Sequence, residues 1–137
     1  MSDSPERLVT IIAGSRSFND LDYSMFLDCL TKVPWTISKV CSGTARGIGR
    51  MGERWAREHE IPIRRFPADW SQGKSAGHAR NQQMADYAEA LVAVWDGQST
   101  GTMDMVTRAR ARGLQVCLFR KVPMEKQVQQ QAPGDEL

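Results

Sequence analysis

Residues 91–102 read LVAVWDGQSTGT, an apolar run that breaks into Asp-Gly and then into small hydroxyl residues and glycine. The run 91–95 is continuously apolar rather than alternating, which is typical of a strand covered on both faces in a parallel sheet. The small residues after it would let backbone N–H groups approach an anion, and a helix starting there would present its positive end. We therefore expect a central strand followed by an anion-binding loop. The candidate ligand-binding residues of this loop are Gly97, Ser99, Thr100, Gly101 and Thr102.

The same order of strand, glycine-containing loop and helix occurs elsewhere in the chain. Residues 8–13 precede Gly14-Ser15-Arg16, and residues 36–41 precede Ser42-Gly43-Thr44. Helical spacing or length predicts helices at 22–33, 48–59, 76–88 and 102–112, and further strands at 61–66 and 114–119. The pattern predicts an α/β protein: a single Rossmann-like, doubly wound parallel sheet of about five strands with helices on both faces.

Length and composition agree with one domain. The chain has 137 residues, of which 41% are hydrophobic, enough for a single core. We expect the domain at 8–122, preceded by a flexible N-terminus at 1–7. Residues 123–137 are expected to form a disordered tail, because Gln, Pro and Gly there replace any apolar rhythm.

Charge, cysteines and motifs exclude several classes. The net charge of +2 is too small to indicate a nucleic-acid binder, and three widely spaced cysteines indicate reduced thiols and no metal site. No apolar run is long enough for a membrane span, so we expect a cytoplasmic protein without a membrane partner. Neither GxGxxG nor GxxxxGK[ST] occurs, which disfavours a dinucleotide or Walker site, and no cofactor is expected.

In a doubly wound sheet, ligands bind beyond the carboxyl ends of the strands, where these loops meet. Arg16 could clamp a phosphate bidentately or make a surface ion pair. Trp70 offers a flat surface on which a base could stack, and Lys74 could contact a phosphate or be solvated. The predicted ligand-binding residues before position 75 are Gly14, Ser15, Arg16, Ser42, Gly43, Thr44, Asp69, Trp70 and Lys74.

Carboxylates and one histidine near these loops allow for chemistry as well as binding. Asp69 and Asp96 could accept hydrogen bonds from ribose hydroxyls or act as a base, but either could instead cap the turn or helix that follows. His78 could act as a general acid or base, or be an ordinary surface group at a helix start.

Five motifs in chain order resemble the YspA-like branch of the SLOG superfamily, a Rossmann-like set that includes cytokinin-activating phosphoribohydrolases and the DNA-processing DprA proteins. They are Gly14-Ser15-Arg16, the segment 42–47 (SGTARG), Ala68-Asp69-Trp70, the segment 73–81 with Arg80-Asn81, and 97–102. The resemblance covers about 9–119. It implies a pocket for a nucleotide or nucleotide derivative, with the Ser-Thr-Gly-Thr loop on a phosphate and Arg80 and Asn81 near the ligand.

The chain departs from this family at three places, one of which is that Ala79 precedes Arg80-Asn81 where the family usually has Pro. Gly49 stands where the family often has Asp. Asp104 and Met105 stand where the phosphoribohydrolases carry a pair of glutamates that supports N-glycosidic cleavage.

Three hypotheses follow. The first is a sensor or sequestering module that binds a nucleotide-like small molecule. The second is an N-glycosidic hydrolase acting on a nucleoside monophosphate or nucleotide derivative, with Asp69, Asp96 or Asp104 as the catalytic carboxylate. The third, a nucleic-acid module, is suggested only by the DprA relationship and is disfavoured by the low net charge. One-domain members of the superfamily often pair, which is compatible with a homo-oligomer.

Overall fold

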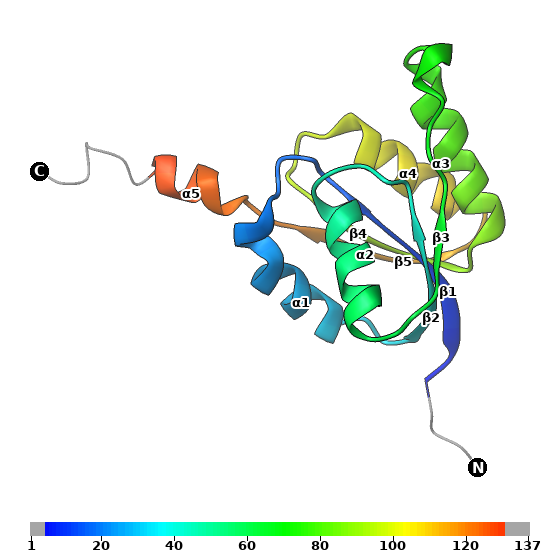
Figure 1. The fold of residues 1–137 in the computed structure, drawn as a ribbon, viewed down its shortest axis with the longest axis horizontal. Helices are drawn as coiled ribbons and strands as arrows, with labels where there is room; N and C mark the ends of the chain where they lie inside the picture. The colour runs from blue at the N-terminus through cyan, green and yellow to red at the C-terminus, as the bar shows by residue number, and fades with distance from the viewer. Residues whose placement is uncertain (1–4, 131–137) are drawn as a thin grey trace, which may run out of the picture.

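The computed structural model describes residues 5–130, which form one five-stranded parallel sheet between two pairs of helices (Figure 1). The strands are β1 (Arg7–Gly14), β2 (Thr36–Ser42), β3 (Ile63–Arg65), β4 (Ala90–Trp95) and β5 (Gln115–Arg120). The helices are α1 (Tyr23–Thr31), α2 (Ile48–Glu58), α3 (Ser75–Tyr87), α4 (Thr100–Ala111) and α5 (Met124–Gln130), with 3-10 turns η1 (Asp20–Asp22) and η2 (Trp70–Gln72). The predicted Rossmann-like α/β fold is confirmed.

The two faces of the sheet bury separate clusters of apolar side chains. In β1, Ile12 packs in the cluster shared with α1 and α2, whereas its neighbour Ile11 packs in the cluster shared with α3 and α4. In β4, Val92 packs in the first cluster and its neighbour Leu91 packs in the second. All four side chains are fully buried. The continuous apolar sequence of these strands therefore follows from burial on both faces.

The strand order β3-β2-β1-β4-β5 positions the candidate site. The chain moves outward from β1 to β2 and β3, and then returns to the other side of β1 with β4 and β5. The order thus reverses between β1 and β4, the place where open α/β sheets leave a crevice at the carboxyl ends of their strands. The loops after these two strands begin at Ser15 and Asp96.

Three segments differ from the sequence-based expectation. β3 spans only Ile63–Arg65 instead of 61–66, at an exposed edge of the sheet. The loop before α3, expected to hold no element, contains the turn η2.

The third difference is the helix α5, which occupies residues 124–130 of the segment 123–137 that was expected to be a disordered tail. Its backbone begins after Pro123, where the N–H of Met124 donates to Asp22 Oδ1 at 2.8 Å. This contact with η1 could not be read from the local composition. The predicted tail residues 131–137 and the start of the predicted flexible N-terminus, 1–4, lie outside the described residues. Between residues 5 and 130, no helix is long and apolar enough to cross a bilayer.

Candidate functional site

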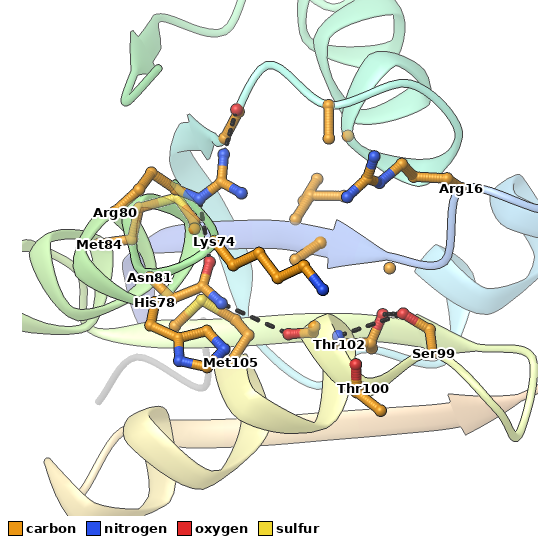
Figure 2. Close-up of a pocket in the computed structure, with 18 of the residues that line it drawn as sticks. Arg16, Lys74, His78, Arg80, Asn81, Met84, Ser99, Thr100, Thr102 and Met105 are labelled. Atoms are coloured by element: carbon orange, nitrogen blue, oxygen red, sulfur yellow. Dashed lines mark hydrogen bonds between the residues drawn. The ribbon is translucent and has the colours of Figure 1, made fainter. Parts of the chain in front are cut away.

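A pocket of about 680 Å³ lies at the carboxyl ends of β1 and β4 (Figure 2). Its volume is in the range usual for small-molecule sites. Many of the predicted site residues line it. They are Gly14, Arg16, Gly43, Trp70, Lys74, Arg80, Asn81, Asp96, Ser99, Thr100, Gly101 and Thr102.

Three cationic side chains give the pocket its charge. Figure 2 shows the guanidinium groups of Arg16 and Arg80 pointing toward one another, with Lys74 extending between them and the start of α4. None of the three makes a salt bridge to any residue from 5 to 130. The pKa of Arg80 is lowered, first by burial and then by the positive charge of Arg16. The partly buried guanidinium of Arg80 therefore has the exposed like charge of Arg16 near it.

Arg80 is held in place by the loop after β2 and by its neighbour on α3. Its Nη1 donates to the carbonyl oxygen of Gly43, and its Nε donates to Asn81 Oδ1 at 3.0 Å. A Cβ atom at position 43 would lie 2.5 Å from Arg80 Nη1. Gly43 is thus needed for the close approach of a guanidinium, whereas the sequence predicted it as part of an anion-binding loop.

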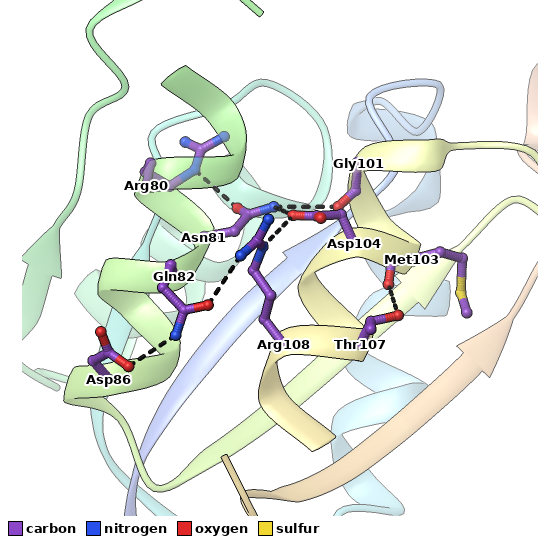
Figure 3. Close-up of polar contacts among 9 residues, drawn as sticks. All are labelled: Arg80, Asn81, Gln82, Asp86, Gly101, Met103, Asp104, Thr107 and Arg108. Atoms are coloured by element: carbon purple, nitrogen blue, oxygen red, sulfur yellow. Dashed lines mark hydrogen bonds and ion pairs between the residues drawn. The ribbon is translucent and has the colours of Figure 1, made fainter. Parts of the chain in front are cut away.

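A polar network between α3 and α4 supports this arrangement (Figure 3). The buried Asn81 donates from Nδ2 to Asp104 Oδ2 at 3.0 Å, and Arg108 Nε donates to the same oxygen at 2.9 Å. Burial acts to raise the pKa of the Asp104 carboxyl, but the hydrogen bonds from Arg108 and Asn81 outweigh it and lower the pKa. Asp104 is therefore an ionised anchor for Asn81, and it is not among the residues that line the pocket.

The predicted anion-binding loop ends in the first turn of α4. Ser99 is the N-cap residue, and its Oγ accepts from the N–H of Thr102 at 3.4 Å and from Thr102 Oγ1 at 3.0 Å. Trp95 Nε1 donates to the carbonyl oxygen of Ser99 at 3.0 Å. The N–H groups at the start of a helix have no intrahelical partners and favour a negative charge. Because Thr100 and Gly101 line the pocket, this helix end is directed at it.

Asp96 lines the pocket, but loop hydrogen bonds engage both of its oxygens. Oδ1 accepts from the N–H groups of Gln98 at 2.8 Å and Ser99 at 2.9 Å, and Oδ2 accepts from Ser17 Oγ at 2.7 Å. Burial acts to raise the pKa of Asp96, but these hydrogen bonds outweigh it and lower the pKa to about 2. Ser15 Oγ accepts from the Asp96 N–H at 3.0 Å, so the two loops are tied together.

Six predicted site residues do not line the pocket: Ser15, Ser42, Thr44, Asp69, Gly97 and Asp104. Asp69 is the N-cap of η2, and its carboxylate accepts from the Ser71 N–H at 3.2 Å, which matches the capping alternative. Hydrogen bonds from Ser71 and Gln72 lower its pKa.

The other predicted residues outside the lining shape the loops. Ser42 Oγ donates to Glu53 Oε2 at 2.6 Å and accepts from the N–H of Thr44 at 3.0 Å. Gly97 has a φ of 87°, a left-handed conformation that favours glycine.

The prediction omitted several residues that line the pocket. Met84 and Met105 are buried and were indistinguishable from ordinary core residues, because only the packing of α3 against α4 brings both to the pocket. His78, which the sequence left open, also lines it. Trp70 is 55% exposed, and its Cη2 atom lies 3.2 Å from where a Cβ of Gly77 would be. Between residues 5 and 130, no three His, Cys, Asp or Glu side chains gather in a way that could hold a metal ion.

The fold and the pocket define a Rossmann-like protein with a cation-lined pocket where the strand order reverses. Residues 8–73 match the model of the family described as YspA, cpYpsA-related SLOG. The predicted resemblance to the YspA-like branch of the SLOG superfamily is confirmed over these residues, which run from β1 to just past η2. The match suggests a nucleotide-related ligand or a related activity. No curated protein and no solved structure matches the chain.

Proposed function

We propose that the chain binds a nucleotide or nucleotide-derived small molecule in this pocket and acts as a sensor or sequestering module. The observation that carries the proposal is the pair Arg16 and Arg80, which point toward one another without a carboxylate partner among residues 5–130. The partly buried Arg80 and the exposed Arg16 repel each other, and an anion between them would replace repulsion with two attractions.

The surroundings of this pair suit a phosphate. Lys74 and the first turn of α4 face the same space and would add one charge and backbone N–H donors. The same pocket has an apolar part at Met84 and Met105, and Trp70 offers an exposed ring at its mouth. A phosphate between the two arginines and a base against the apolar part would use both kinds of surface.

Binding without turnover is favoured by the carboxylates. Among the three candidate catalytic residues, only Asp96 lines the pocket. Its oxygens already accept three hydrogen bonds that build the loop, and a carboxyl with a pKa of about 2 is a weak base.

One observation keeps the N-glycosidic hydrolase as a second candidate. Asp96 is an ionised carboxylate within the pocket, and such a group can stabilise the oxocarbenium-like charge that develops on a ribose. In this alternative Asp96 acts through its charge.

The test is mass spectrometry of a mixed nucleotide pool, including cyclic and ADP-ribose-type compounds, after incubation with the purified chain and separation of bound from free. Retention of one intact compound supports binding, whereas release of a base plus a sugar phosphate supports the hydrolase. Arg16→Ala should abolish retention, and Arg110→Ala on the exposed side of α4 is the matched control. If all compounds come back free and unchanged, both candidates are wrong.

A further inference from the structure

A second depression of about 620 Å³ adjoins the candidate pocket, and Arg16 lines both. We call it the arginine groove. Five arginines line it: Arg16, Arg46, Arg50, Arg54 and Arg57. The only carboxylates in its lining within residues 5–130 are Asp20 and Glu125, so the groove has an excess of positive charge.

Two of the five arginines have partners within the fold. Arg54 Nε lies 3.2 Å from Glu58 Oε2, and the guanidinium stacks 3.8 Å from the Tyr23 ring centroid. Arg57 Nη1 lies 3.8 Å from Glu53 Oε1. These contacts partly neutralise Arg54 and Arg57.

The arginines nearest the candidate pocket differ. Arg16, Arg46 and Arg50 make no salt bridge within the described part of the chain. Arg50 also has Arg54 four residues later on the same helix, and like charges at this spacing destabilise a helix. An unneutralised cluster beside a cationic pocket is an unfavourable arrangement that a bound anion would relieve.

We propose that the arginine groove binds the distal part of an extended phosphate chain whose nucleoside end occupies the candidate pocket. The inference rests on the proposed function. It narrows the class of ligand proposed for the pocket to nucleotides with several phosphates. Arg16 is the link, because a phosphate chain leaving the candidate pocket past Arg16 enters the groove directly. Arg46 and Arg50 then contact the distal phosphates.

The distribution of charged residues in the arginine groove favours a small anion over a nucleic acid as the ligand. Single-stranded nucleic acids are bound along continuous basic tracks with stacking aromatic side chains. Here Asp20 and Glu125 border the arginines, and the aromatic side chain in the lining, Phe18, is buried. The positive charge is therefore local.

The test is calorimetric titration of the full chain with inorganic tripolyphosphate, AMP, adenosine tetraphosphate and a short single-stranded oligonucleotide at constant ionic strength. The variant is Arg46→Gln/Arg50→Gln, two exposed side chains without salt bridges between residues 5 and 130, and the matched control is Arg110→Gln/Lys126→Gln, at two exposed positions outside both linings. We expect the wild type to bind the tetraphosphate at least about tenfold more tightly than AMP. The double variant should lose this gain and its affinity for tripolyphosphate, but keep its affinity for AMP.

Three results would overturn the proposal. If AMP binds but the longer phosphate chain adds nothing, the groove is wrong while the proposed function stands. If tripolyphosphate binds but neither nucleotide does, the proposed function is wrong. The proposal that one ligand spans the candidate pocket and the arginine groove is then wrong as well. If a short single-stranded oligonucleotide binds more tightly than the tetraphosphate and the double variant loses that binding, the groove serves a nucleic acid instead.

Discussion

The guanidinium of Arg80 donates a hydrogen bond to the carbonyl oxygen of Gly43, and a Cβ atom at position 43 would lie 2.5 Å from its Nη1. The contact joins α3 to the loop after β2, two segments that are 37 residues apart. It holds the cationic group on one side of the pocket before any ligand arrives. The position of Arg80 therefore depends on the absence of a side chain at residue 43.

Gly43→Ala should displace Arg80 and weaken binding. We expect a loss of about tenfold in nucleotide affinity, because one charge-assisted contact would be misplaced. The control is Arg110→Ala, at an exposed position of α4 outside the pocket lining. That variant should keep its affinity. Equal affinities for both variants would contradict the role of Gly43.

Asn81→Ala should destabilise the protein more than a neighbouring change on the same helix. Asn81 is buried and joins Arg80 to Asp104, so its loss leaves two charged groups with fewer partners. We expect a decrease of about 1–3 kcal/mol in the free energy of unfolding, measured with urea. Gln83→Ala, at an exposed position of α3, should change it by less than about 0.5 kcal/mol. Similar losses in the two variants would contradict the network.

Acid should weaken the fold through Asp96. Its pKa is lowered to about 2 in the folded protein, so the carboxylate stabilises the fold above the unfolded-state pKa of about 4. This stabilisation is lost as the pH falls from about 4 toward 2 and amounts to about 2 kcal/mol. Asp96→Asn should therefore have a lower free energy of unfolding than the wild type at neutral pH. Its free energy of unfolding should also fall less than that of the wild type when the pH is lowered from about 4 toward 2. Urea unfolding of both proteins across this pH range is the measurement, and parallel pH profiles would contradict the assignment.

Trp70→Ala should lower nucleotide affinity and leave the free energy of unfolding almost unchanged. The ring is 55% exposed, so the free energy of unfolding should change by less than about 0.5 kcal/mol. Loss of a stacked base should lower nucleotide affinity by about 1–3 kcal/mol. Trp35→Ala is the contrasting variant, because Trp35 is buried and donates to Thr10 Oγ1 at 3.0 Å. It should destabilise the fold by about 3 kcal/mol or more. Unchanged affinity in Trp70→Ala would remove this residue from the site.

The sequence predicted the sheet well because its strands are buried on both faces. The run 91–95 is β4, and the glycine and hydroxyl residues after it form a loop and a helix start that line the pocket. Local composition was less informative at the edges of the fold. β3 is short and exposed, and α5 depends on a contact with Asp22 from 102 residues earlier in the chain.

The candidate site was predicted in part for a similar reason. Residues such as Arg16 and Asp96 lie just after β1 and β4 and so reach the edge that the topology dictates. The contributions of Met84, Met105 and the Asn81–Asp104 pair require the packing of α3 on α4, which no local pattern reports. Asp69 and Ser42 were of the right type for a site, but their hydrogen bonds shape loops.

The pairing of Arg16 with Arg80 is tested most directly by the ratio of affinities for a nucleoside and its monophosphate, using the base that the nucleotide pool identifies. If the two guanidinium groups hold the phosphate, the monophosphate binds at least about tenfold more tightly, and Arg16→Ala lowers this ratio severalfold. Equal affinities for nucleoside and monophosphate in the wild type, or an unchanged ratio in Arg16→Ala, would contradict the account.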